Sequence, residues 1–336
     1  MSVSDQDNVD LFMRELTQRF VVEEGEAKPV DFLLGMAVDQ DLVQGTVSVN
    51  MEAYIKRLAE GILTKEELER SKSVDTPMLV TPLPKQSTRT VTVEAFDYLS
   101  VVGSLLHASN CVRVDIALAV GILARHAATP GAAHVAAAKR VIAYLYNTKH
   151  LGITYYRSSA QPNVPTIYEG AKDPLDNGTN HLQTFVDSDY ATDVSRRSVM
   201  GNVIMLNGGP ISWTSVLGKT VCTSTAEAEV SAAVVAAKEA VHLKQLLVDI
   251  GIMPDSNPLI IAEDNAACIA QCEAGLRHVR NAKHYEVRLA FLQQLVVDNE
   301  VQFRYCPTDH MLADFLTKPL DVQKFTYFRD QIMSKR

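Results

Sequence analysis

The positions of apolar and polar residues predict a mostly helical first half of the chain. Residues 94–148 are rich in Ala, Leu and Val, and their spacing predicts two or three helices that break at Thr129-Pro130-Gly131. Further upstream, the pattern predicts a helix over 9–20, a hairpin from 32–38 and 46–50, and a helix over 51–60. Three prolines within 71–92 predict an extended connection.

After residue 183 the pattern becomes that of a mixed sheet. Three alternating stretches predict strands over 184–189, 199–206 and 210–216, with a turn at Asn207-Gly208-Gly209. The elements predicted next are a helix over 225–250, a strand over 259–262, helices near 265–273 and 283–298, a strand over 301–305 and a helix beginning at 311–316. Antiparallel strands followed by alternating helices and strands predict an α/β domain. The polar stretch 157–183 is the predicted linker.

Composition restricts the class of protein. The 336 residues suffice for two or three domains, and 47% apolar with 21% charged residues is typical of a globular protein. No apolar run approaches the ~20 residues that span a bilayer, and the acidic N-terminus does not resemble a secretory signal. Five cysteines without a CxxC pair favour a reducing compartment. We therefore expect an intracellular protein that is not secreted.

Charge is unevenly distributed along the chain. Residues 1–100 contain 10 basic and 18 acidic side chains, whereas 101–336 contain 22 of each. Within 101–150 the only acid is Asp115, and the basic residues there are Arg113, Arg125, Lys139, Arg140 and Lys149. This local excess suits binding of a phosphate backbone. A solvated helix face explains it equally well.

The candidate chemistry lies in four carboxylates of the second half. Side chains alternate along a strand, so Phe185, Asp187 and Asp189 share one face, and an inward-facing carboxylate needs a partner. Three further acids lie inside or directly after apolar elements: Glu229, Asp264 and Asp314. Four converging acids would repel one another unless divalent cations lay between them. Two-metal sites that cleave phosphodiesters are built in this way.

Each acid also has an ordinary structural explanation. Asp264 could cap the helix that follows it, and Asp314 could be a dipole-favoured acid in a first helical turn. Ser224 and Glu227 fit a capping box, so we expect Glu229, which adjoins an apolar stripe, to face the sheet. For each acid considered alone, the structural role is the favoured explanation. The ordered set of strand Asp, helix Glu, strand-end Asp and helix Asp favours a metal site.

Residues 184–320 resemble the ribonuclease H domain of copia-type LTR retrotransposon polyproteins. The resemblance is carried, in order, by Val-Asp-Ser-Asp-Tyr-Ala-Thr-Asp (186–193), Arg-Arg-Ser-Val-Met-Gly (196–201), Ile-Ser-Trp-Thr-Ser (211–215), Lys-Thr-Val-Cys-Thr-Ser-Thr-Ala-Glu-Ala-Glu (219–229), Glu-Asp-Asn (263–265), Lys-His-Tyr-Glu-Val-Arg (283–288) and Leu-Ala-Asp-Phe-Leu-Thr-Lys-Pro-Leu (312–320). Residues 94–155 resemble the thumb and connection of the same polyprotein. The stretches that begin at Phe32 and Met51 resemble the end of its polymerase palm.

The resemblance implies a fold class and a domain organisation. The fold class is α/β, with a ribonuclease H-like mixed five-stranded sheet and flanking helices, preceded by a mostly helical thumb and connection. The expected domains are a remnant of the reverse transcriptase palm and the start of the thumb over 1–70, a helical thumb and connection over 71–156, the linker 157–183 and the ribonuclease H-like domain over 184–336.

The resemblance also implies an activity, namely Mg²⁺-dependent hydrolysis of the RNA strand of RNA–DNA hybrids. Asp187 is expected to be the shared ligand of two Mg²⁺ ions, for which Mn²⁺ can substitute, and the other ligands are expected to be Glu229, Asp264 and Asp314. His284 and His310 lie in or beside matched motifs, and an ordinary surface or core histidine is the favoured role for each. The implied location is a cytoplasmic virus-like particle or the nucleus, and other products of the polyprotein are expected partners.

Two further expectations concern nucleic acid and the polymerase. The predicted nucleic-acid contacts are Arg113, Arg125, Lys139, Arg140, Arg196, Arg197 and Lys219. Polymerase activity is not expected, because the Tyr-x-Asp-Asp hairpin of the family would precede residue 1 and the chain contains no Asp-Asp pair. Two alternatives stay open: a catalytically silent remnant that still binds hybrid, and a structural relic without a partner.

Overall fold

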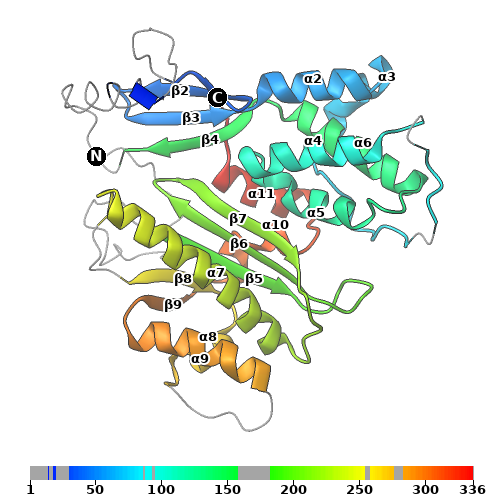
Figure 1. Ribbon diagram of the computed structural model, residues 1–336. Helices are drawn as coiled ribbons and strands as arrows, with labels where there is room; N and C mark the ends of the chain where they lie inside the picture. The colour runs from blue at the N-terminus through cyan, green and yellow to red at the C-terminus, as the bar shows by residue number, and fades with distance from the viewer. Residues whose placement is uncertain are drawn as a thin grey trace.

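The computed structural model describes most of the chain. The described residues are 14, 18–19, 30–85, 88–92, 95–157, 182–253, 258–275 and 283–335. Within them, helices flank two five-stranded sheets, which Figure 1 shows in separate parts of the molecule. None of the helices in these ranges is long and apolar enough to cross a membrane.

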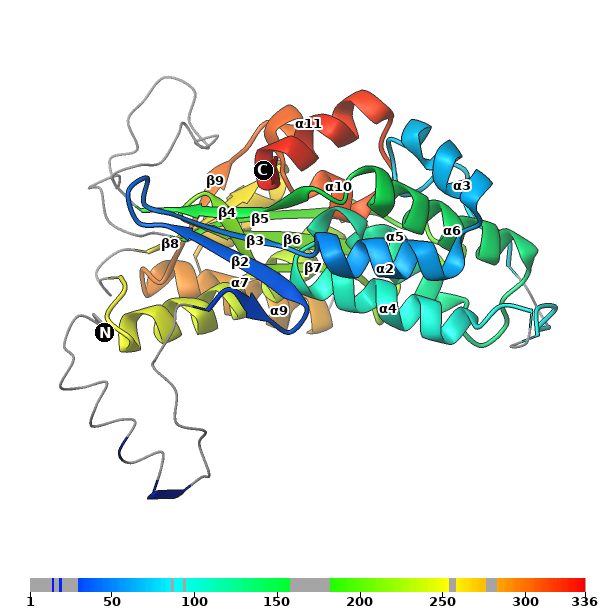
Figure 2. The same cartoon turned by 90° about the horizontal axis from the view of Figure 1, so that it is seen from above.

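The first sheet combines strands from distant parts of the sequence. Its order is β1-β2-β3-β4-β10, and all neighbours are antiparallel. The strands are β1 (Phe32–Leu33), β2 (Met36–Asp41), β3 (Thr46–Asn50), β4 (Leu151–Tyr156) and β10 (Ser334–Lys335). The predicted hairpin is confirmed only in part: its second strand is β3, but residues 32–38 contain β1, a turn at Leu34 and Gly35, and the start of β2. The sequence pattern predicts neither β4 nor β10. Because β10 pairs with β4, the C-terminus lies beside the first sheet, as Figures 1 and 2 show.

Helices extend from one end of this sheet. They are α2 (Glu52–Ile62), α3 (Lys65–Arg70), α4 (Tyr98–Cys111), α5 (Ala117–Arg125) and α6 (Ala132–Asn147). The helices predicted within 94–148 are thereby confirmed. Asp97 caps α4 by accepting a hydrogen bond from the backbone N–H of Ser100. The helix predicted over 9–20 lies outside the described residues, apart from three helical positions at 14 and 18–19.

The second sheet has the mixed topology expected for a ribonuclease H-like fold. Its order is β7-β6-β5-β8-β9, in which β5, β6 and β7 pair antiparallel while β8 and β9 run parallel to β5. The strands are β5 (Leu182–Asp189), β6 (Val199–Leu206), β7 (Gly209–Leu217), β8 (Leu259–Glu263) and β9 (Val301–Tyr305). Asn207 and Gly208, with φ of 52° and 84°, form the predicted turn. The α/β class and the mixed five-stranded sheet are confirmed.

One predicted limit within this sheet is wrong. Residues 182–183 belong to β5 rather than to the linker, because they pair with Leu206 and Met205 of β6. Apart from Arg157 and these two residues, the predicted linker lies outside the described part of the chain.

The helices of the second half are α7 (Thr225–Asp249), α8 (Ala266–Glu273), α9 (Lys283–Val297), α10 (Asp314–Thr317) and α11 (Val322–Ile332). The helix predicted to begin at 311–316 is only one turn long, because Lys318 has the extended backbone that a residue before proline favours. Pro319 follows it, and Asp321 then caps α11. The chain therefore changes direction between α10 and α11.

Two apolar clusters cover the two faces of the second sheet. Phe185 and Val203 pack into a cluster that includes residues of α4, α5, α6, α10 and α11. Their neighbours Val186 and Ile204 point the other way, into a cluster with α7, α8 and α9. The helical first half and the second sheet thus share one core. Apart from the end of the linker at residues 182–183, the domain limits expected from the sequence stay a prediction.

Candidate active site

Four elements bring the predicted acids to one edge of the second sheet. Asp187 lies near the end of β5, and Asp264 directly follows β8. Because β5 and β8 run parallel, their carboxyl ends meet at the same edge. Glu229 is in the second turn of α7, which packs on the sheet, and Asp314 is the first residue of α10. The four side chains therefore come from different elements and lie at the same edge of the second sheet.

The carboxylates form two overlapping groups. One ligand oxygen each from Asp187, Asp264 and Asp314 lie within 4.8 Å of one another. Glu229, Glu263 and Asp264 form a second group within the same distance. Asp264 belongs to both, so the cluster contains five acids. Their catalytic and metal-binding roles stay predictions.

Most of this charge is buried. Asp187, Glu229, Glu263 and Asp314 are each less than 5% exposed, and only Asp264 is partly open to solvent. Burial raises the pKa of Asp187 to about 6, against the opposing effect of Lys318. Burial and the nearby Asp187 raise the pKa of Glu229 to about 8. Burial and the nearby Glu229 also raise the pKa of Glu263 well above its usual value.

Two lysines partly neutralise the group around Asp314. Lys318 Nζ lies 2.9 Å from Asp314 Oδ1 and 3.8 Å from Asp187 Oδ2. Lys324 of α11 places its Nζ 3.1 Å from Asp314 Oδ2. The Thr317 hydroxyl donates a hydrogen bond to Asp187 Oδ2. These contacts reduce the repulsion between Asp187 and Asp314.

The residues present fit a divalent metal. Among buried side-chain oxygens without a hydrogen bond are both of Asp314, Oε2 of Glu229 and Oε2 of Glu263. The lysine contacts to Asp314 are short enough for ion pairs, but they do not complete the hydrogen bonding of its oxygens. Both candidate groups consist of carboxylates alone, and such hard oxygen ligands suit Mg²⁺ or Mn²⁺ rather than Zn²⁺.

Glu263 is absent from the site predicted from the sequence. The sequence pattern predicts a strand that ends at Ala262, with Asp264 as the strand-end acid. Alternation along β8 gives the missing signal: Leu259, Ile261 and Glu263 share one face, and the first two pack in the cluster that contains α7. Glu229 belongs to α7, which covers this face of the sheet, so the alternation along β8 places Glu263 on the same side as Glu229.

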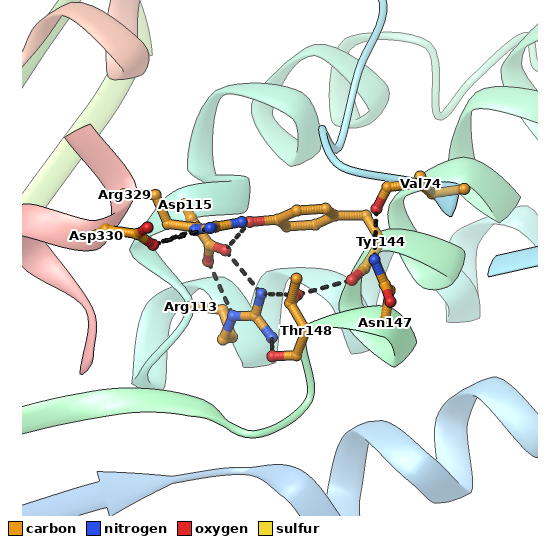
Figure 3. Close-up of polar contacts among 8 residues, drawn as sticks. All are labelled: Val74, Arg113, Asp115, Tyr144, Asn147, Thr148, Arg329 and Asp330. Carbon is orange, nitrogen blue, oxygen red and sulfur yellow. Dashed lines mark hydrogen bonds and ion pairs between the residues drawn. The ribbon is translucent and has the colours of Figure 1, made fainter. Parts of the chain in front are cut away.

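The predicted nucleic-acid contact at Arg113 is wrong. Its side chain is fully buried, and its guanidinium donates to both carboxylate oxygens of Asp115 at 2.9 and 2.7 Å. Thr148 accepts two further hydrogen bonds from it (Figure 3). A phosphate backbone therefore has no access to Arg113. One of the five basic residues in 101–150 is therefore part of a buried ion pair and not of a charged surface.

The other basic candidates stay predictions. Three of them make contacts within the fold: Arg125 with Asp193 at 3.0 Å, Lys139 with Glu67 at 2.8 Å, and Arg140 with Thr76 at 3.0 Å. Arg196 and Lys219 are exposed, and Arg197 is half-buried. Arg196 and Arg197 are in the loop after β5, and Lys219 is in the loop after β7. A hydrogen bond connects the two loops, because the Gly218 N–H donates to the Ser198 carbonyl at 2.8 Å. These loops lie at the same edge as the acids.

The two histidines are placed differently. His310 lies in a short 3₁₀ turn at Thr308–His310, with Nδ1 3.3 Å from the hydroxyl of Tyr327. The side chain of His284 lies outside the described part of the chain. Neither histidine belongs to the two carboxylate groups among the described residues. Their roles stay predictions.

Comparison with known proteins places the chain among retrotransposon proteins. No family model matches it. It is 30% identical over 311 residues to the retrovirus-related Pol polyprotein from transposon TNT 1-94 of Nicotiana tabacum, covering 90% of this chain and 21% of that protein. It is 27% identical over 318 residues to the Pol polyprotein from transposon RE1 of Arabidopsis thaliana, covering 94% of this chain and 20% of that protein. The chain thus spans about a fifth of the length of these relatives.

A shorter relative and two solved structures complete the comparison. The chain is 37% identical over 147 residues to secreted RxLR effector protein 161 of Plasmopara viticola, covering 44% of this chain and 90% of that protein. LC11-RNase H1, isolated from compost, matches 41% of this chain and 92% of its own at 19% identity and a TM-score of 0.30. A foamy viral protease-reverse transcriptase matches 83% of this chain and 38% of its own at 13% identity and a TM-score of 0.35. Given the polyprotein relatives and the order of its sequence motifs, the chain belongs to the copia-type retrotransposon Pol polyproteins.

Proposed function

We propose that this chain hydrolyses the RNA strand of RNA–DNA hybrids in a Mg²⁺-dependent reaction, as the ribonuclease H part of a retrotransposon reverse transcriptase. The observation that carries the proposal is the buried acidic cluster at the carboxyl edge of β5 and β8, in which Oε2 of Glu229 and Oε2 of Glu263 have no hydrogen-bond partner among the described residues. A stable protein rarely leaves buried carboxylate oxygens without partners, because each costs free energy. A cation supplied from solution would satisfy them.

The residues of the cluster hold and shape the cation sites. When bound, Mg²⁺ supplies an activated water and stabilises the negative charge on the leaving 3′-oxygen. Asp264, which belongs to both groups, is the only partly exposed acid of the five, so it lies where the cluster opens to substrate. The sequence motifs suggest Asp187 as the shared ligand, and that assignment remains part of the proposal. Thr317 orients the Asp187 carboxylate by donating to one of its oxygens.

The loops at the same edge supply charge of the opposite sign for the hybrid. Arg196 follows β5 and Lys219 follows β7, and both are exposed. A cationic rim beside an acidic cluster holds the phosphate backbone while the metal ligands face the scissile bond. The hybrid is thus the proposed partner, together with other products of the polyprotein, and the proposed location is a cytoplasmic particle or the nucleus.

The decisive experiment is cleavage of an RNA–DNA hybrid labelled at the 5′ end of its RNA strand. We expect cleavage by the purified chain with Mg²⁺ and none with EDTA, and intact RNA–RNA and DNA–DNA duplexes in parallel reactions. Asp187→Asn is the matched variant, because it keeps the shape of the side chain and removes a metal-binding charge. Cleavage that persists in EDTA or in this variant would point to a contaminating nuclease. A folded chain that binds hybrid without cleaving it would instead identify a catalytically silent remnant.

A further inference from the structure

Glu263 occupies a position in the acidic cluster that the four expected acids do not explain. It is the last residue of β8, and its side chain is fully buried. It lies on the face of the sheet that α7 covers, with Leu259 and Ile261 on the same face. A glutamate in this position of a buried strand is costly unless it interacts with an opposite charge or a ligand.

The backbone holds the Glu263 carboxylate in a defined orientation. Oε1 accepts a hydrogen bond from the Asn265 N–H at 3.1 Å, so that oxygen is occupied. Oε2 is buried and has no hydrogen-bond partner. One carboxylate oxygen each from Glu263, Glu229 and Asp264 lie within 4.8 Å of one another. The carboxylate that carries this unpaired oxygen thus lies beside two further carboxylates.

Lys318 and Lys324 form their ion pairs with the group of acids that contains Asp187 and Asp314. The ion pairs of Lys318 and Lys324 within the described residues reach Asp187, Asp309 and Asp314. Among the described residues, no ion pair reaches Glu229, Glu263 or Asp264 from either lysine. A divalent cation would supply positive charge to this group of three carboxylates.

We propose that Glu263 is a further ligand of a divalent cation that also binds Glu229 and Asp264 on the α7 side of the sheet. The proposal rests on the metal dependence of the proposed function, and it adds a fifth carboxylate to the four expected from the sequence. Oε2 of Glu263 is the ligand atom. The Asn265 N–H positions it by holding Oε1.

The test is Mn²⁺ binding, measured by isothermal titration calorimetry and by electron paramagnetic resonance of the free ion. We expect the parent chain to bind two Mn²⁺ ions. Glu263→Gln keeps the size and the Asn265 hydrogen bond but removes the charge. It should leave one site unchanged and weaken the other by more than about tenfold, the loss that even an outer-shell change can cause. Glu263→Asp keeps the charge on a shorter side chain and should lie between the two.

Glu227→Gln is the control, because Glu227 is a half-buried acid in the first turn of α7 that lies outside both carboxylate groups, and its carboxylate accepts hydrogen bonds from Thr223. It should bind Mn²⁺ like the parent. Parent-like binding of two ions by Glu263→Gln would overturn the proposal, and Glu263→Asp decides the matter in the same way if the Gln variant does not fold. A parent chain that binds Mn²⁺ but does not cleave hybrid would refute the proposed function alone. A parent chain that binds no Mn²⁺ would refute both.

Discussion

Two buried polar clusters in this molecule are built in opposite ways. Around Arg113 the charges are balanced: the guanidinium binds Asp115 through two nitrogens, and Tyr144 donates to Asp115 Oδ2 at 2.5 Å (Figure 3). At the edge of the second sheet, five acids meet two lysines, and four carboxylate oxygens have no hydrogen bond. The first cluster is complete without a ligand. We propose that the second binds a divalent cation.

The balance of charges within a buried cluster distinguishes a structural role from a chemical role more clearly than the burial of its residues does. Arg113 and Asp314 are both fully buried. The Arg113 cluster joins α6 to the C-terminal helix, because Arg329 of α11 lies beside the Tyr144 hydroxyl and pairs with Asp330 at 2.8 Å (Figure 3). We therefore expect substitutions there to change stability, and substitutions in the acidic cluster to change activity.

The largest expected effect is loss of cleavage in Glu229→Gln. The substitution removes a metal-binding charge, so Mg²⁺-dependent cleavage of the hybrid should fall below detection while the free energy of unfolding stays unchanged or rises. Glu227→Gln, two residues earlier on the same helix, should keep its activity, because the Glu227 carboxylate accepts hydrogen bonds from Thr223 and belongs to neither carboxylate group. Initial cleavage rates and urea denaturation of both variants measure this. The reverse pattern would exchange the roles of the two glutamates.

The next effect concerns the balanced cluster. Arg113→Met leaves Asp115 buried without its partner, so we expect the free energy of unfolding to fall by about 3–5 kcal/mol. The double variant Arg113→Met with Asp115→Leu should recover most of this loss, because no unpaired charge remains. Urea denaturation measures the change, and the folded fraction of each variant should cleave hybrid at the parent rate. If the double variant is no more stable than the single one, the ion pair is not the cause of the loss.

The third prediction follows from the raised pKa values of the acidic cluster. The pKa of Asp187 rises from its ordinary 3.8 to about 6 in the folded protein, and the pKa of Glu229 rises from 4.5 to about 8. At pH values between the ordinary and the raised pKa, the folded state binds more protons than the unfolded state. The stability of the metal-free protein should therefore fall as the pH rises through this range. Mg²⁺ binds the ionised carboxylates and should therefore stabilise the protein more at about pH 8 than at about pH 5.

Thermal unfolding midpoints in EDTA and in Mg²⁺ test this dependence. Glu229→Gln removes one of the responsible groups, so its midpoint in EDTA should vary less with pH than that of the parent. A parent midpoint in EDTA that rises over the same range would show that the buried acids are not the groups that control the pH dependence.

The smallest expected effect concerns the start of α7. Ser224 caps this helix by accepting a hydrogen bond from the Glu227 N–H at 3.2 Å. Ser224→Ala should lower the free energy of unfolding by about 0.5–2 kcal/mol, since the cap bond is lost. Ser224→Asp, which restores an acceptor at the same position, should recover it. Equal stability of all three proteins in urea would show that the cap contributes nothing.

Local patterns were sufficient to predict most of the second sheet. The alternation in 199–206, the Asn207-Gly208 turn and the apolar run at 259–262 correspond to observed elements, because each depends on neighbouring residues in the sequence. The four acids could be ordered along the chain for the same reason. By contrast, β4 and β10 depend on pairing between residues that are far apart in the sequence, which periodicity does not encode.

The errors at the candidate site share a physical cause. Composition predicts a surface charge at Arg113 because it does not reveal the partner of this side chain, although Asp115 is only two residues away. The sequence pattern does not single out Glu263, because Asp264 follows it directly and the position of Glu263 depends on the face of the sheet that α7 covers. In both cases the identity of the residue was informative only together with its three-dimensional neighbours.

The pairing of β10 with β4 has a consequence for how the chain is made. Synthesis proceeds from the N-terminus, so β4 leaves the ribosome long before residues 334–335 exist. Until then Leu151 and Gly152, the residues of β4 that pair with β10, lack these partners, and an unpaired strand edge is a template for wrong pairing with other strands. The first sheet therefore reaches its final form only after the second sheet and α11 have been synthesised. Termination of translation before residue 334 would release a chain in which Leu151 and Gly152 lack the strand that pairs with them.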